Sequence, residues 1–239
     1  MIKWIKGILL VLFVIVLIVL ISLRIITYAP SDQIADLLLE EHVTVTRHAI
    51  EVMPKDAVIA TLVFYQGGLV DTAAYLALAN QLSEHGIHVI LPKMPLNLAI
   101  INRFAFNDFY EAGSTPYFIA GHSLGGASAT YVVSTDPEKV AGIILLAAYP
   151  PESVDLSHIT QPVLSITASE DKILNQAQFL STQRLLPSHT EYVVIDGGNH
   201  AYFGSYGPQR NDGNATITAE QQLMMTVFLI VQMIEKTLQ

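Results

Sequence analysis

The chain has no cysteine among its 239 residues. This absence excludes disulfide bonds, a thiol nucleophile and any metal site built on cysteine ligands. Charged residues are also few, at 14% of the chain. Three of the 12 basic residues precede residue 31 and all 21 acidic residues follow it, so residues 31–239 carry a net charge of −12. That charge repels nucleic acids and anionic lipid surfaces, and we expect no nucleic-acid partner.

Apolar residues, in contrast, make up 51% of the chain, and many of them stand near its start. Residues 7–23 contain no charge, and two isoleucines extend the run beyond Arg24. This length is close to that of a helix that spans a bilayer. A cleaved signal peptide is the alternative, but its apolar core is shorter, at about 7–15 residues, and Pro30 follows the candidate cleavage site. We therefore predict an uncleaved transmembrane anchor at residues 1–26.

The charges that flank this run predict its orientation. Lys3, Lys6 and the amino terminus precede it, whereas Arg24 is the one basic residue that follows closely. Basic flanks stay on the cytoplasmic side. We therefore expect a single-pass protein of the cytoplasmic membrane with an extracytoplasmic domain. Residues 27–33 are interpreted as a linker and residues 34–239 as that domain.

Beyond the linker, apolar stretches typical of buried strands alternate with helical stretches. Such alternation predicts a mostly parallel sheet with helices on both faces. Ligands bind to such sheets at the carboxyl ends of the strands. Strands are predicted at 43–52, 58–65, 87–94, 117–122, 140–149, 162–169 and 191–196, and helices at 71–86, 96–112, 123–135, 171–186 and 218–238.

One pentapeptide at such a strand end has the pattern of a nucleophile. Residues 121–125 read Gly-His-Ser-Leu-Gly, between a predicted strand and a predicted helix. A serine on a tight turn there projects its hydroxyl above the sheet. The N–H of Leu124, at the helix start, is then placed to stabilise an oxyanion. The pentapeptide also arises by chance, but its strand and helix context favours Ser123 as a nucleophile.

A serine nucleophile needs a base, and His200 is the best placed of the histidines. It follows the last predicted strand, on the glycine-rich loop 197–213. The others lie on an outer strand, near a helix end, in connecting loops, or, as His122, beside Ser123 on the sharp turn, where adjacent side chains diverge. A loop at the carboxyl edge of the sheet can bring His200 over Ser123.

The base in turn needs a carboxylate to orient it. Asp171 follows a buried strand and precedes a predicted helix, so it is a candidate for this role, although a helix cap is the alternative. Glu170 and Asp196 are weaker candidates, the latter because it ends its own strand. The order serine, aspartate, histidine is that of the α/β-hydrolase fold.

Two further groups of residues complete the predicted site. Gly67 and Gly68, after a central strand, are candidates for the second oxyanion donor, with Gly68 preferred. A phosphate-binding loop is the alternative, but no Gly-Lys-Ser/Thr follows. Loop 197–213 also holds candidates for the substrate pocket, for which loop packing is an equal interpretation: Asn199, Tyr202, Phe203 and Tyr206. We expect no metal and no cofactor.

Four motifs carry a resemblance to a known family: YQGGLV, KMPLNLA, GHSLGG and GGNHAYFGSYGPQRNDG. With them the chain resembles small bacterial hydrolases in the dienelactone-hydrolase-like branch of the α/β-hydrolase superfamily, over roughly residues 45–230. The resemblance implies the triad Ser123, Asp171 and His200. The chain departs from the pattern at Gln66, where proline is expected.

These observations predict a membrane-anchored serine hydrolase that acts on carboxylic esters or related acyl compounds. A thioesterase or acyltransferase would use the same residues, and a non-catalytic binding protein on this fold is the rival class. The stretch 150–161, between two predicted strands, is too short for a helical cap domain. We therefore expect an open site and a small acyl substrate.

Overall fold

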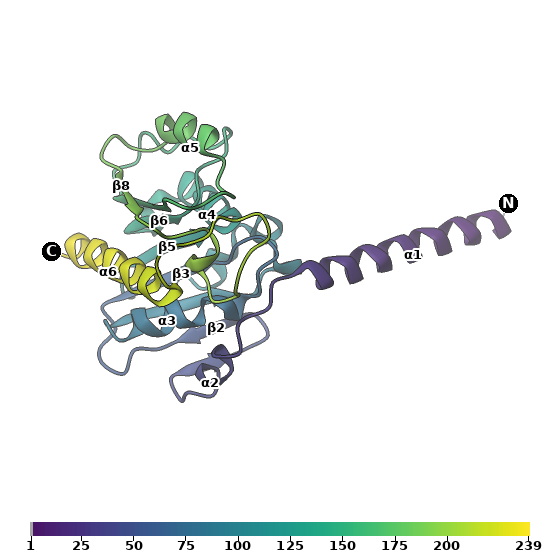
Figure 1. Ribbon diagram of the computed structural model, residues 1–239, viewed down its shortest axis with the longest axis horizontal. Helices are drawn as coiled ribbons and strands as arrows, with labels where there is room; N and C mark the ends of the chain where they lie inside the picture. The colour runs from purple at the N-terminus through teal and green to yellow at the C-terminus, as the bar shows by residue number, and fades with distance from the viewer. Residues whose placement is uncertain (1) are drawn as a thin grey trace.

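The strands meet in one eight-stranded sheet in the computed structural model, which describes residues 2–239 (Figure 1). The order is β1-β2-β4-β3-β5-β6-β7-β8. Strands β3 to β8 run parallel, while β2 pairs antiparallel with both β1 and β4. The strands are β1 (Val43–Val45), β2 (Ala49–Val52), β3 (Ala60–Tyr65), β4 (Ile87–Pro92), β5 (Tyr117–His122), β6 (Gly142–Leu146), β7 (Val163–Ala168) and β8 (Glu191–Ile195).

Helices bury both faces of this sheet. In β3, Leu62 and Phe64 pack into the core on one face, and Val63 and Tyr65 into the core on the other. Because side chains alternate along a strand, a central strand covered on both sides buries every position and is therefore mostly apolar. Helices α3 (Leu76–Ser83) and α6 (Ala219–Thr237) cover the first face, and α4 (Leu124–Thr135) covers the second.

This architecture confirms the predicted α/β-hydrolase fold. It also confirms that no sizeable cap domain is present in the described chain, because no helix or strand lies between β6 and β7. The candidate site therefore lies at the carboxyl edge of the parallel strands without a helical cover. The two remaining helices of the domain are short, α2 (Ile34–Leu37) and α5 (Gln176–Thr182).

The helix predicted at 96–112 is wrong. The chain instead makes three short 3-10 turns, at Pro95–Asn97, Ala99–Asn102 and Ala105–Asp108. Leu96 and Asn97 both have a φ of 55°, in the left-handed region, which interrupts a right-handed helix at its start.

Two other predicted elements are shorter than expected. The stretch 171–186 yields α5 and a 3-10 turn at Gln183–Leu185, because the Asp171 carboxylate accepts hydrogen bonds from the N–H groups of Ile173 and Leu174 and so holds a turn before α5. Asn175 then caps α5 by accepting from the Gln178 N–H. The strand predicted at 43–52 is a hairpin, since the chain turns between β1 and β2.

The amino-terminal helix α1 (Ile2–Ile26) projects from the domain, on the opposite side from the carboxyl terminus (Figure 1). Its residues Ile8–Ile26 are long and apolar enough to cross a membrane, and none of them is buried. The stretch predicted as a linker is fastened to the domain. The Tyr28 N–H donates to the Leu69 carbonyl at 2.8 Å, and the Asp71 N–H donates to the Tyr28 carbonyl at 2.9 Å.

Candidate active site

Ser123 lies on a strained turn between β5 and α4. Its φ of 52° and ψ of −122° place a non-glycine residue in a region that side chains normally avoid. The turn is tight because neighbouring backbones touch. A Cβ at Gly121 would lie 2.5 Å from the main chain of Gly125, and one at Gly125 would lie 2.3 Å from the Tyr65 carbonyl. The glycines of the motif are therefore required for the shape that exposes the serine.

His200 and Asp171 form a buried hydrogen-bonded pair. The His200 Nδ1 lies 2.8 Å from the Asp171 Oδ2, and both residues are at most 4% exposed. The other oxygen, Oδ1, accepts from two main-chain N–H groups at 2.8 Å each. These bonds fix the orientation of the Asp171 carboxylate, and the carboxylate in turn fixes the orientation of the imidazole. In the part of the chain that the structure describes, the Nε2 of His200 is left free. Neither Glu170 nor Asp196 makes a hydrogen bond to His200 within the described residues.

A cavity of about 290 Å³ brings Ser123 and His200 together at the carboxyl edge of the sheet. Its other walls are mostly apolar and come from the start of α4, the end of β6 and the turn after β7: Leu124, Ala127, Ala147, Ala148, Tyr149, Ile173, Leu174 and Asn175. This cavity is at the small end of the range for ligand sites. Sequence reasoning missed the wall after β7, because a helix was predicted there.

The four predicted pocket residues do not line this cavity, which corrects that interpretation. Phe203 packs on His122, with ring centroids 5.6 Å apart, and Tyr206 packs on Tyr28 at 5.4 Å. Tyr202 lies on a separate surface hollow against α2 and α3. Asn199 donates to the Gly213 carbonyl and accepts from the Tyr202 N–H. All four instead help to fix the loop that carries His200, as the loop-packing interpretation predicts.

The structure distinguishes between the candidate oxyanion donors. The Gly67 N–H donates to the Tyr75 hydroxyl at 2.9 Å and is therefore occupied. The Gly68 N–H has no hydrogen-bond partner within residues 2–239. The Gly68 backbone also lies against Leu124, since a Cβ there would be 3.1 Å from the leucine side chain. Leu124 begins α4, where N–H groups have no partner inside the helix. Gly68 and Leu124 thus keep free donors, and Gly67 does not.

A buried hydrogen-bond chain joins the loop after β3, which we call the oxyanion loop (residues 66–71), to the nucleophile turn. The Tyr75 hydroxyl accepts from the Gly67 N–H at 2.9 Å and is also hydrogen-bonded to the His122 Nδ1, 2.7 Å away. Burial, and then the nearby His200 at 4.5 Å between ring centroids, hold the pKa of His122 well below its usual value. Burial also raises the pKa of Tyr75.

The neutral His122 predicts a loss of stability in acid. Its pKa in the folded state lies below the unfolded value of about 6.5, so the unfolded chain binds the extra proton and stability falls as pH drops below about 6.5. One such group contributes at most about 1.4 kcal/mol per pH unit. Thermal unfolding of the full chain in detergent, measured from pH 7.5 to pH 5, should show a smaller drop for His122→Gln. The exposed His48→Gln should behave like the wild type, and an unchanged slope in His122→Gln would contradict the assignment.

Two polar residues that sequence reasoning did not single out hold the His200 loop. Gln222, on α6, is fully buried; its side chain accepts from the Asn199 N–H at 2.9 Å and donates to the Asn199 carbonyl at 2.8 Å. Asp212 accepts from the Ala201 N–H and from the Lys172 N–H, and so joins the loop to the turn that carries Asp171. Gln222 and Thr226 are the two polar residues among the buried, otherwise apolar positions of α6, and this break in the apolar pattern could have marked Gln222.

The family is shown by the sequence itself. Residues 61–224 match the model of the Alpha/beta hydrolase family. This range is more than half of the chain, and the chain belongs to that family. No curated protein sequence matches the chain significantly.

Solved structures share the fold at low sequence identity. Dienelactone hydrolase from Anabaena variabilis superposes with a TM-score of 0.59 at 16% identity, over 79% of this chain and 90% of that one. A predicted CIB-like hydrolase from Thermoplasma acidophilum gives 0.60 at 18%, over 81% and 98%. An esterase domain from a Rhodothermus marinus protein gives 0.56 at 14%, over 77% and 92%. The dienelactone-hydrolase-like fold inferred from the motifs is therefore confirmed.

Proposed function

We propose that the protein is a serine hydrolase of carboxylic esters that uses Ser123, His200 and Asp171. The observation that carries the proposal is the shared cavity. Ser123, on its strained turn, lines the same cavity as His200, whose Nδ1 is bonded to a buried carboxylate. A histidine oriented in this way is suited to accept a proton from a serine hydroxyl. Membership of the hydrolase family, and the esterase and dienelactone hydrolase among the structural neighbours, support this class of activity.

The proposed reaction follows from the placement of these groups. His200 Nε2 takes the proton of Ser123 as its Oγ attacks the ester carbonyl carbon. The N–H groups of Leu124 and Gly68 stabilise the negative oxygen that forms. When the ester bond breaks, the alkoxide leaves with the proton from His200, and an acyl-enzyme remains. Water, deprotonated by His200, then attacks the acyl carbon, and Ser123 regains its proton as the acid leaves.

The cavity favours a small acyl group. With about 290 Å³ and no helical cap, it shields little of a long chain from water, and each methylene left unburied forfeits about 0.8 kcal/mol. We expect kcat/KM to be higher for p-nitrophenyl acetate or butyrate than for the palmitate, with no rise above the micelle threshold of the ester. A preference for palmitate would mean that another surface supplies an acyl tunnel.

We also propose that α1 anchors the protein in the cytoplasmic membrane with the domain outside. Its length and apolar surface, and the two lysines before the run, support this orientation. Because the chain has no cysteine, Leu238→Cys creates a single thiol at the far end of α6. In intact spheroplasts this thiol should react with a membrane-impermeant maleimide. Reaction only after lysis would place the domain in the cytoplasm.

A further inference from the structure

The segment that follows the anchor is hydrogen-bonded to loops at the carboxyl edge of the sheet, where the candidate active site lies. Main-chain hydrogen bonds join three segments in series. Tyr28, just after α1, pairs with Leu69 and Asp71 on the oxyanion loop, and the Leu69 N–H donates to the Asn97 carbonyl at 2.8 Å. Asn97 belongs to the loop after β4, which we call the apolar loop (residues 95–104). The anchor therefore fixes the height of this loop relative to the membrane.

The apolar loop exposes large side chains that the domain does not bury. Four of them are between 37% and 53% exposed: Leu96, Ile100, Ile101 and Phe104. Leu96 has a left-handed backbone conformation, which costs free energy for a residue with a side chain of this size. Clustered apolar side chains on a surface mark a contact with a partner or a membrane.

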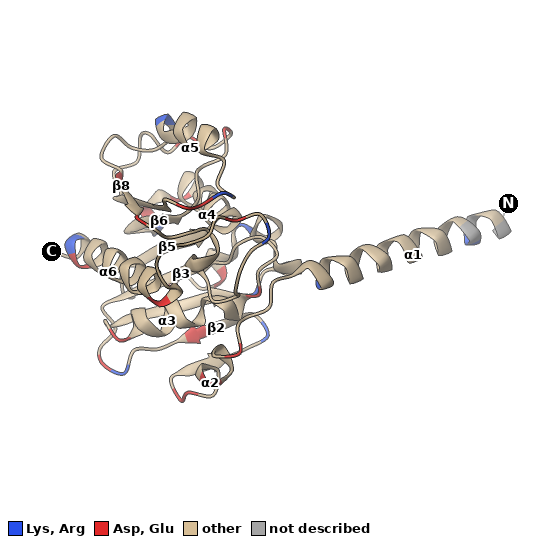
Figure 2. Ribbon diagram, viewed as in Figure 1, with Lys and Arg blue, Asp and Glu red and all other residues tan. Residues whose placement is uncertain are grey.

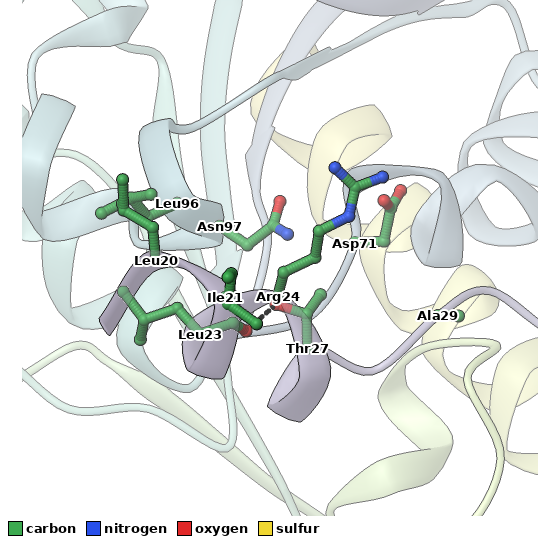
Figure 3. A pocket seen from close by; sticks show the side chains of 9 residues that line it. All are labelled: Leu20, Ile21, Leu23, Arg24, Thr27, Ala29, Asp71, Leu96 and Asn97. Carbon is green, nitrogen blue, oxygen red and sulfur yellow. Dashed lines mark hydrogen bonds between the residues drawn. The ribbon is translucent and has the colours of Figure 1, made fainter. Parts of the chain in front are cut away.

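The position of Leu96 beside the anchor identifies which partner this is. The stretch Ile8–Ile26 is 19 residues long, or about 28 Å as a helix, which only just crosses a hydrocarbon core of about 30 Å. Its uncharged part, up to Leu23, is therefore all needed in the core, including Leu20 and Ile21. Leu96 lines the same cavity of about 610 Å³ as these two residues (Figure 3). A domain residue thus lies level with anchor residues that the hydrocarbon surrounds.

Charge agrees with this placement. The domain is strongly acidic, and its Asp and Glu residues occur in many of its segments (Figure 2). Residues 93–107, in contrast, contain Lys93 and Arg103 and no carboxylate. Arg24, near the end of α1, lines the same cavity as Asp71 and Asn97 (Figure 3). This is the level at which the headgroups would lie. Basic residues beside an apolar insertion are typical of membrane-surface segments.

We propose that the apolar loop inserts into the outer leaflet beside α1. This contact holds the carboxyl edge of the sheet, and with it the candidate active site, at the bilayer surface. The inference rests on the anchoring proposed above and is independent of the catalytic assignment.

The test uses single thiols in the cysteine-free full chain, labelled with a fluorophore and reconstituted in phosphatidylcholine vesicles. Ile101→Cys reports on the apolar loop, Ile15→Cys on the anchor, and Leu238→Cys on an exposed apolar position at the opposite end of the domain. A nitroxide on the upper acyl chain should quench about half the emission at Ile101, because interfacial side chains lie roughly 5–10 Å into the boundary of headgroups and acyl chains. Emission at Leu238 should not change.

Each other outcome overturns the inference in a distinguishable way. Quenching at Ile15 with Ile101 no more quenched than Leu238 would leave the anchor in place and remove the loop contact. No quenching at Ile15 would show that α1 does not insert, and both proposals would fall. Ile100→Cys is a second position on the loop, and an unchanged unfolding temperature shows that a labelled variant is folded.

Discussion

Ser123→Ala is expected to lower kcat/KM for p-nitrophenyl butyrate by at least about three powers of ten, because it removes the attacking oxygen and leaves the histidine without a proton to take. The loss should appear in kcat, since the small methyl group leaves the apolar cavity walls in place. Steady-state kinetics of the purified full chain in detergent measure it. The matched control is Ser134→Ala, which alters an exposed serine near the end of α4, the helix that follows Ser123. This variant should retain wild-type rates.

Ser123→Gly separates the catalytic role from a structural one. Glycine adopts a φ of 52° without strain, so this variant should unfold at a temperature equal to or above that of the wild type. Its activity should be as low as that of the alanine variant. If the alanine variant kept its rate, the nucleophile would be another group.

Asp171→Asn is expected to lower kcat by about four powers of ten. The asparagine oxygen can still accept from Ile173 and Leu174, so the turn is retained. Its amide nitrogen would then face the His200 Nδ1, where the carboxylate now accepts. A donor at that place forces the imidazole proton onto Nε2, and His200 can no longer accept the proton of Ser123. The expected result is a folded protein with the wrong tautomer.

The neighbouring carboxylates provide the controls for this variant. Glu170→Gln alters a side chain that accepts from the Ser169 hydroxyl, and Asp196→Asn alters an exposed residue just after β8. Both should retain kcat within a few fold of the wild type. A near-normal rate in Asp171→Asn, together with collapse in either control, would assign the acid to the wrong carboxylate.

The sheet could be predicted from the sequence because its central strands are apolar at most positions. The nucleophile turn could also be placed, since the glycines that its geometry requires surround Ser123. The turn after β7 could not, because the side chain of Asp171 forms its own hydrogen bonds with the backbone and delays the helix to Gln176. From the sequence alone, an aspartate at the start of the stretch 171–186 is equally consistent with a cap on a helix that begins there.

The pocket was harder to predict than the candidate catalytic residues. Tyr202, Phe203 and Tyr206 stand near His200 in the sequence, but Phe203 and Tyr206 pack against other aromatic rings, and Tyr202 lines a separate surface hollow. The walls come instead from segments distant in the chain, such as Ala148 and Leu174. The part played by Tyr75 was also hidden, since its hydroxyl reaches Gly67 and His122 only after β3 and β5 pair.

The most direct test of the proposed function is to locate the covalent adduct of a fluorophosphonate on the wild-type chain. The reagent reacts with a serine whose hydroxyl is activated by a base and whose oxyanion is stabilised. Peptide mass spectrometry after a brief reaction should find one phosphonylated residue, Ser123, and prior heat denaturation should abolish the reaction. Absence of an adduct on the folded protein, or an adduct at a different residue, would contradict the assignment of Ser123 as the nucleophile.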